Sequence, residues 1–167
     1  MTVSAASRRK LCGGSARYTA RILHTLGPMD LPEWPDGTVA ILVTGGGPVH
    51  AIPVSTAVRA GPRSVVFALS SRRESLRRVR AEPRVALALL CEGDVAITAY
   101  GTAAVVEEPL RGLDGMVAVA LDVDEIADHN QPRFEIEAGV RWRWTDPEAE
   151  RRDAAVRAAL RQLTRLA

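Results

Sequence analysis

The residues best suited to bind a ligand lie in Ser70–Val85, which reads SSRRESLRRVRAEPRV. This segment follows the apolar run Val65–Leu69 and leads into a second apolar run, Val85–Leu90. We therefore expect a strand, a short arginine-rich helix that stops at a proline, and another strand. Ser71 and Glu74 have capping-box spacing, in which a hydroxyl and a carboxylate each satisfy a backbone N–H at the helix start.

A helix that starts in this way attracts compact anions. Its first N–H groups have no partner within the helix and together carry about half a positive charge. Arg72 and Arg73 add two guanidinium groups, which bind phosphate through paired hydrogen bonds. These residues predict a phosphate site at the end of a strand. The alternative is an arginine-rich helix face that meets only water.

Few residues are arranged for other chemistry. The two cysteines lie in unlike contexts and the three histidines are scattered, so neither a disulfide framework nor a metal site is predicted. No Ser-His-Asp or Cys-His set is placed for nucleophilic catalysis. We expect Asp122, Asp124 and Glu125 to lie on the surface or to pair across strands with Arg141 and Arg143.

The composition is that of a globular protein with room for one domain. The chain has 167 residues, of which 47% are hydrophobic and 25% charged, with a net charge of +2. So small a charge does not indicate a polyanion partner, and an aromatic content of 4% is low for stacking on bases. For both reasons we do not expect nucleic acid as a partner. We expect no membrane partner either, because no apolar run reaches membrane-spanning length. The cysteine usage and the lack of a secretory signal predict the cytoplasm.

Short strands dominate the remaining sequence. Residues 1–30 are rich in Ser, Ala, Gly and Arg and are interpreted as a tail or arm, which leaves a domain at 31–167. Gly101 indicates a bulge or bend within the expected strand Val95–Val106. Apolar runs and alternating patterns predict strands at Val39–Thr44, Val49–Val58, Val65–Leu69, Val85–Leu90, Val95–Val106, Val117–Val123 and Val140–Trp144.

A terminal helix is expected near Pro147–Leu166, because Asp146 can cap it and Pro147 suits its first position. The patterns together predict a mainly β protein with few helices. The expected fold is a six- to seven-stranded antiparallel split β-barrel, with a short helix after strand 3 and the C-terminal helix. The short helix should lie near Ser71–Glu82.

The order of these elements resembles the FMN-binding split-barrel proteins related to pyridoxamine 5′-phosphate oxidase. The resemblance covers about three-fifths of the chain, from Val39 to Trp144. Four segments carry it, corresponding to the first hairpin, the phosphate loop with its helix, a central strand and the final strand of that family: Gly45–Val54, Ser70–Leu87, Ala99–Glu108 and Gly139–Trp144.

The resemblance implies a homodimer that encloses FMN, with the cofactor carrying out the chemistry on a small-molecule substrate. No catalytic side chain is assigned. The flavin ring would lie along the second strand, at Pro53, Val54 and Ser55, with Trp142 as a further candidate. The ribityl chain and phosphate would be held by residues at and after the third strand: Leu69, Ser70, Ser71, Arg72, Arg73, Ser75 and Arg78.

One departure from the family leaves the cofactor open. Many members carry a basic pair where this chain has Glu74 and Ser75. FMN is the expected cofactor, and the deazaflavin coenzyme or none is the alternative. The expected function is a flavin- or deazaflavin-dependent oxidoreductase that moves a hydride to or from a small planar substrate. The alternatives are a non-catalytic cofactor-binding or sequestering protein and a small nucleic-acid-binding barrel.

A homodimer is also expected from the residues themselves. The strand Val85–Leu90 is apolar on both faces, and the interior of a barrel covers only one of them. The other face then needs a partner surface.

Overall fold

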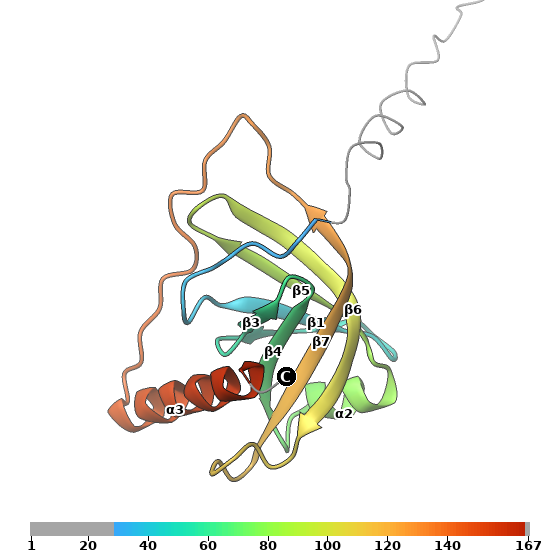
Figure 1. The fold of residues 1–167 in the computed structure, drawn as a ribbon, viewed down its shortest axis with the longest axis vertical. Coiled ribbons are helices and arrows are strands. Elements are labelled where there is room, and N and C mark those ends of the chain that lie inside the picture. The colour runs from blue at the N-terminus through green and yellow to red at the C-terminus, as the bar shows by residue number, and fades with distance from the viewer. Residues whose placement is uncertain (1–28, 166–167) are drawn as a thin grey trace, which may run out of the picture.

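A computed structural model describes residues 29–165, which form one antiparallel sheet and two helices (Figure 1). The expected tail therefore lies almost entirely outside the described residues. The strands are β1 (Ala40–Thr44), β2 (His50–Val54), β3 (Val58–Gly61), β4 (Ser64–Ser70), β5 (Arg84–Cys91), β6 (Val95–Glu107) and β7 (Met116–Asp128). The helices are α2 (Glu74–Ala81) and α3 (Pro147–Thr164).

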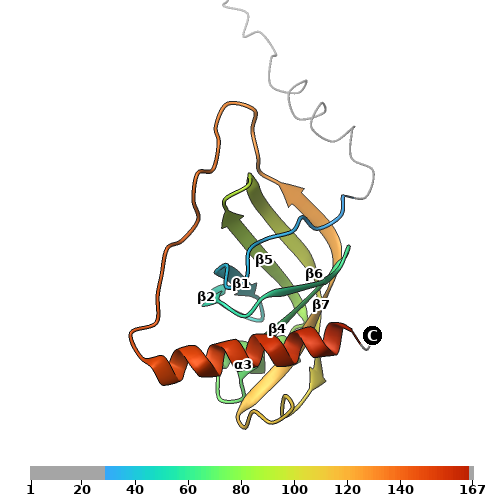
Figure 2. The ribbon, with the colours of Figure 1, turned by 60° about the vertical axis from the view of Figure 1, so that its left-hand side comes forward.

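The seven strands are ordered β2-β1-β5-β6-β7-β4-β3, and every neighbouring pair is antiparallel. The two edge strands, β2 and β3, are separated in the chain only by Ser55–Ala57. The sheet therefore curls until its two edges approach each other (Figures 1 and 2). This architecture confirms the expected mainly β fold, antiparallel and consistent with a split barrel.

The expected second strand is divided in the structure. Val49–Val58 was expected to be continuous, but β2 pairs with β1 and β3 pairs with β4 at the opposite edge. The chain has to leave one edge of the curled sheet to reach the other, so the backbone breaks at Ser55–Ala57. The short helix α2 consequently follows the fourth strand rather than the third.

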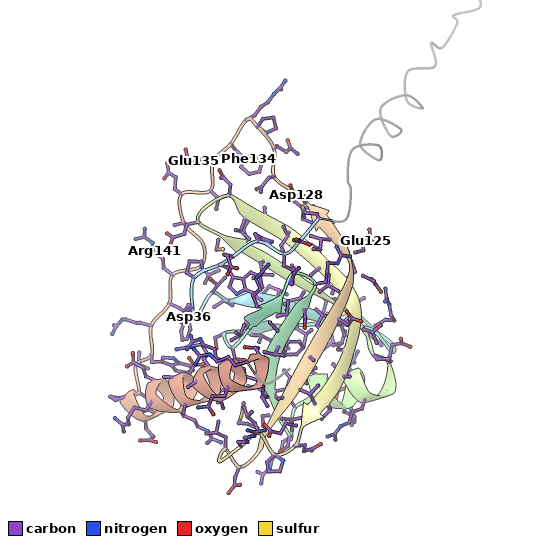
Figure 3. The ribbon with its side chains drawn as sticks, viewed as in Figure 1. Asp36, Glu125, Asp128, Phe134, Glu135 and Arg141 are labelled. Carbon is purple, nitrogen blue, oxygen red and sulfur yellow. The ribbon has the colours of Figure 1, made fainter. Side chains whose placement is uncertain are left out.

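The expected last strand, Val140–Trp144, is wrong. Residues 129–146 instead form an extended connection outside the sheet, which we call the strap (Figure 2). In Figure 3 Phe134 and Glu135 lie near its outer turn. The alternating Val and Trp residues have no strand beside them, and contacts such as a hydrogen bond from Trp142 Nε1 to the Gly37 carbonyl (3.2 Å) hold the strap.

The expected surface position of Asp122, Asp124 and Glu125 is confirmed, because all three are exposed on β7. Their alternative pairing across strands with Arg141 and Arg143 is not observed. Because the strap does not join the sheet, Arg141 and Arg143 have no strand position opposite these carboxylates. Asp124 instead forms an ion pair with Arg84, which lowers the pKa of the aspartate.

Helix α2 begins at Glu74, two residues later than a capping box of Ser71 and Glu74 would require. Arg73 is its N-cap and provides no side-chain cap, while the Glu74 carboxylate accepts from Arg78 Nε at 2.9 Å. The Ser71 N–H donates to the Gly115 carbonyl at 2.8 Å. The capping-box prediction is therefore wrong, because the loop after β4 is tied to the neighbouring β6–β7 turn.

Two apolar cores hold these elements together. The larger fills the barrel interior and includes Leu42, Phe67, Leu87 and Leu121, all fully buried. The smaller lies where α3 crosses the outer face of β4, and its buried members are Val66, Ala68, Leu110, Ala118, Val156 and Leu160.

Neither described helix combines the length and the apolar character that a membrane span needs.

Helix α3 starts as expected. The Asp146 side chain accepts the Glu148 N–H at 2.9 Å, and Pro147 is the first helical residue. The amphipathic face then buries Val156 and Leu160 against the sheet. The cap and this packing fix the first turns of α3, which form one wall of the cavity described next.

Candidate functional site

A cavity of about 300 Å³ lies between the ends of β2 and β4 and the first half of α3; we call it the α3 cavity. Its position follows from the topology, because the β2–β3 connection and the end of β4 meet beneath α3. Its lining residues are Ile52, Pro53, Val54, Ser55, Thr56, Ala68, Leu69, Ser70, Arg73, Met116, Trp144, Ala149, Arg152, Asp153 and Val156.

Two segments that the sequence analysis selected meet in this cavity. The first is the end of β2 with the residue after it, and the second is the end of β4 with the start of the α2 loop. The expected site residues found in the lining are Pro53, Val54, Ser55, Leu69, Ser70 and Arg73. The expected residues outside it are Ser71, Arg72, Ser75, Arg78 and Trp142.

Ser75 and Arg78 face away from the α3 cavity and join α2 to the β1–β2 hairpin. Ser75 is 1% exposed, and its Oγ is hydrogen bonded to His50 Nε2 at 3.1 Å. Arg78 Nη1 donates to the Pro48 carbonyl at 2.6 Å. Both side chains therefore stabilise the contact between α2 and the β1–β2 hairpin.

One end of the α3 cavity carries positive charge. Ser70 and Arg73 are adjacent there, since the Arg73 N–H donates to the Ser70 carbonyl at 2.9 Å. Met116 lies opposite Ser70 in the β4–β7 register, and Arg152 reaches the nearby Asp114 carbonyl at 3.0 Å. No hydrogen bond or ion pair joins the exposed Arg73 guanidinium to another described residue. This end can therefore bind an anion.

The remaining walls are largely apolar. Ile52, Pro53 and Val54 contribute one side, and Val156 of α3 contributes another. The strap adds Trp144, whose ring stands edge-on to Trp142 with centroids 5.0 Å apart and planes at 79°. Walls of this kind suit an apolar group better than a strongly polar one.

The buried carboxylate of this cavity, that of Asp153, is not among the site residues expected from the sequence. Asp153 is 7% exposed, accepts the Ser55 hydroxyl at 3.0 Å and forms an ion pair with Arg157. A signal for it was present in the sequence. Asp153 lies four residues after Ala149 and seven before Leu160, on the face of the terminal helix that packs inward.

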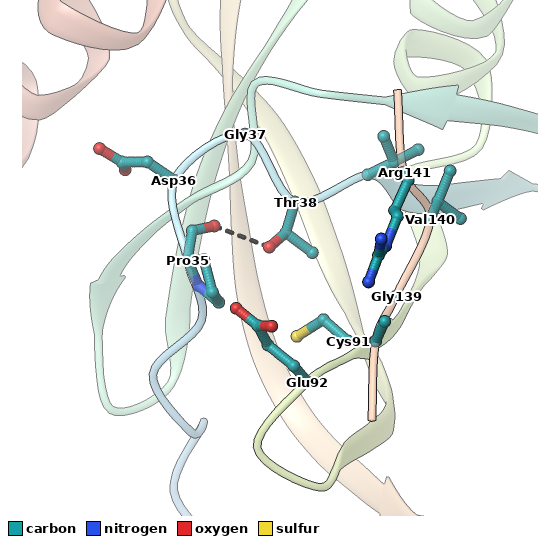
Figure 4. Close-up of a pocket in the computed structure, with 11 residues that line it drawn as sticks. Pro35, Asp36, Gly37, Thr38, Cys91, Glu92, Gly139, Val140 and Arg141 are labelled. Atoms are coloured by element: carbon teal, nitrogen blue, oxygen red, sulfur yellow. Dashed lines mark hydrogen bonds between the residues drawn. The ribbon is translucent and has the colours of Figure 1, made fainter. Parts of the chain in front are cut away.

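A second pocket, of about 240 Å³, lies under the strap beside Cys91 (Figure 4). Gly139 lets the strap pass closely, because a Cβ there would lie 2.8 Å from the Leu90 carbonyl oxygen. Burial raises the pKa of the Cys91 thiol, which keeps the thiol protonated and poorly nucleophilic. In Figure 4 Arg141 and Glu92 also border this pocket.

Among residues 29–165 no His, Cys, Asp or Glu cluster could hold a metal ion.

Comparisons with known proteins give likenesses of fold. No protein-family model and no curated protein matches the sequence. A Listeria innocua protein, named provisionally as a pyridoxamine 5′-phosphate oxidase, is 15% identical over 56% of this chain and 90% of that one, with a TM-score of 0.48. The flavin reductase PheA2 is 15% identical over 57% of this chain and 81% of its own, at 0.44. An FAD-binding protein of Mesorhizobium loti is 12% identical, covering 53% and 83%, at 0.44.

Proposed function

We propose that this protein binds FMN in the α3 cavity and transfers a hydride between that flavin and a small planar substrate. One observation carries the proposal: Arg73, which has no hydrogen-bond or ion-pair partner among residues 29–165, shares a cavity with largely apolar walls. FMN has the same two ends, a phosphate and a planar ring system. The cavity volume of about 300 Å³ lies at the lower end of the range for small-molecule sites.

The residues present fit the two ends of this cofactor. Arg73 and Ser70, beside the start of α2, would bind the phosphate, since guanidinium, hydroxyl and helix-terminal N–H groups all donate hydrogen bonds. Pro53, Val54 and Trp144 would contact the ring. A bound flavin supplies the hydride chemistry, while these side chains orient the ring and exclude water.

Two other assignments of the same cavity are tested alongside FMN. The deazaflavin coenzyme shares a phosphate and a planar ring, so the same residues would serve it. A non-catalytic cofactor-binding protein is favoured by one observation. The only carboxylate in the lining, that of Asp153, already binds Ser55 and Arg157, so it is not free to exchange protons with a substrate.

We also propose that the protein forms a homodimer through the outer face of β1, β5 and β6. Ile41 and Leu90 are 40% and 58% exposed on this face, and Tyr100 lies opposite Ala86 in the β5–β6 register. Apolar residues in adjacent strands form a continuous patch, which in a stable dimer would be covered. Light scattering at micromolar concentration should give twice the chain mass, and Leu90→Glu should give a monomer. A monomeric wild type would contradict the proposal.

Flavin titrations of matched variants test the site. Replacing Arg73 by Ala should weaken FMN binding about tenfold or more, because a hydrogen bond to a charged group contributes roughly 1.5–3 kcal/mol. Riboflavin lacks the phosphate, so its affinity should not depend on Arg73. Arg72→Ala is the control, since this exposed neighbour lies outside the cavity.

Four results would decide among the candidates. Equal FMN affinities of wild type and Arg73→Ala would exclude the phosphate site, and failure of the wild type to bind FMN would exclude FMN as the cofactor. Tighter binding of the deazaflavin in the same titration would replace FMN by that coenzyme. Flavin binding without turnover, in assays with an added reductant and planar electron acceptors, would favour the non-catalytic assignment.

A further inference from the structure

A chain of three polar side chains runs from α3 into the α3 cavity. Arg157 forms an ion pair with Oδ2 of Asp153, and the Ser55 hydroxyl bonds to Oδ1 of the same carboxylate at 3.0 Å. Asp153 is 7% exposed, and the Arg157 side chain is 18% exposed. The arrangement therefore joins a buried ion pair on the helix to a hydroxyl on the opposite cavity wall.

The direction of the hydrogen bond between Ser55 and Asp153 is determined by chemistry. A carboxylate has no proton to donate, and the guanidinium of Arg157 stabilises the ionised form of Asp153. The Ser55 hydroxyl must therefore donate its single proton to Asp153. Its oxygen keeps lone pairs, and because Ser55 lines the cavity, these can accept a hydrogen bond there.

We propose that Asp153 makes Ser55 an obligatory hydrogen-bond acceptor, which selects planar heterocycles that present a ring N–H to the α3 cavity. The ring imide of a flavin has such a donor at N3. A heterocycle that presents only hydrogen-bond acceptors toward Ser55 would place them against the acceptor oxygen of Ser55 and would bind poorly. In this arrangement Ser55 contacts the ligand, and Asp153 is a positioning residue that acts through it. The inference rests on the proposed function in taking FMN as the probe.

The variant Asp153→Asn should release Ser55 from its fixed role as acceptor. Arg157 offers only donors, so it should hold the amide oxygen of the new side chain and turn the amide nitrogen toward Ser55. That nitrogen would donate to the Ser55 oxygen and release the hydroxyl proton toward the cavity. Ser55 could then present either its proton or its remaining lone pair, so a ring N–H would lose an acceptor that is held in place. The exchange replaces one oxygen by one nitrogen and changes the side-chain volume little.

The measurement is the ratio of two dissociation constants, that of 3-methyl-FMN divided by that of FMN. The methyl group removes the ring N–H, so the wild type should bind FMN more tightly, by roughly tenfold, because an unpaired buried acceptor is costly. Ser55→Ala removes the acceptor and gives the ratio that remains for steric reasons alone. Asp153→Asn should lower the ratio from the wild-type value toward that of Ser55→Ala.

A ratio separates this role from a purely structural one. If Asp153 only held α3 in place, its replacement would weaken both ligands equally and leave the ratio unchanged. Glu148→Gln, which removes another carboxylate paired with an arginine on α3, is the matched control and should keep the wild-type ratio. The melting temperature of each variant shows whether it is folded. The double variant Ser55→Ala with Asp153→Asn is measured as well. The double variant should show no fall in the ratio beyond that of Ser55→Ala.

Two outcomes would overturn the inference, and they differ from each other. A wild-type ratio preserved in Asp153→Asn or in Ser55→Ala would exclude the acceptor role while leaving FMN binding intact. Failure of the wild type to bind FMN would exclude the proposed function and this inference together.

Discussion

Thr56 exchanges two hydrogen bonds with the backbone of Ala68: its Oγ1 accepts from the N–H at 3.1 Å and donates to the carbonyl at 3.4 Å. In the β3–β4 register Val58 lies opposite Val66, so residue 56 would fall opposite Ala68. The threonine side chain thus satisfies the backbone groups that a strand residue would otherwise bind. It also fixes the connection that places Ser55 at the α3 cavity.

Thr56→Val should therefore destabilise the fold. Valine has nearly the same shape but leaves the Ala68 N–H and carbonyl without these partners in a buried place. An unsatisfied buried polar group costs about 1–3 kcal/mol, so urea unfolding should show a loss in that range. Thr56→Ser keeps the hydroxyl and should lose less. Equal stability of the valine variant and wild type would show that the two bonds contribute nothing.

Gly101 provides a second test, this time of the β6–β7 pairing. The register shifts between Tyr100 and Gly101, which confirms the expected bulge, and a Cβ at Gly101 would lie 2.0 Å from the Asp122 carbonyl oxygen. Gly101→Ala should cost about 2 kcal/mol or more in unfolding free energy, because backbone cannot move aside as a side chain can. Gly61→Ala is the control, since its nearest contact would be 4.0 Å away. Similar losses in both variants would contradict a specific clash at the bulge.

Local sequence patterns predicted most of the strands and both described helices. A strand such as β7 needs only alternating residues, and the helix α3 begins at a cap, Asp146, whose signal lies within three residues. The strap shows where this reasoning fails. Val140–Trp144 alternates like a strand, but a strand also needs a partner with free backbone groups, and local sequence does not show which edge the chain reaches.

The candidate site was predictable only where local sequence signals mark its residues. Pro53, Ser70 and Arg73 lie at strand ends or a helix start, where local signals and the family resemblance both apply. Asp153 reaches the cavity only because α3 packs back over β4, a contact between segments far apart in the chain. Spacing within one helix cannot reveal that Ser55, in the connection between β2 and β3, lies opposite Asp153.

The pH dependence of stability should report the ion pairs of Glu74. Hydrogen bonds from Arg77 and then Arg78 lower the pKa of this carboxyl from 4.5 to about 2. A depressed folded-state pKa means that the ionised group stabilises the fold above about 4.5, and that this stabilisation is lost as the pH falls toward about 2. The difference in unfolding free energy between wild type and Glu74→Gln should shrink across that interval.

The magnitude of the Glu74 effect should be small and sensitive to salt, because the carboxylate is partly exposed. Raising the ionic strength at neutral pH should reduce the difference between the two proteins. A difference that stays constant with both pH and salt would show that Glu74 acts through helix propensity rather than through its charge.

The last prediction distinguishes the two tryptophans of the strap. Trp144 lines the α3 cavity, whereas Trp142 donates its indole N–H to the Gly37 carbonyl, and their exposed fractions are close, 37% and 40%. If the flavin ring packs on Trp144, Trp144→Ala should weaken FMN binding by roughly twofold to tenfold, the range for one aromatic contact. Trp142→Ala should leave the affinity near that of wild type.

This pair of variants also tests whether the strap acts as a unit. Trp142 fastens the strap to the loop before β1, so its removal would move Trp144 if that one hydrogen bond fixed the strap. Gly139 against Leu90, and the Asp94 carboxylate accepting the Ile136 N–H at 3.0 Å, hold the strap independently. We therefore expect only Trp144→Ala to weaken binding. Equal losses in both variants would show that the strap position, rather than the Trp144 ring, determines the affinity.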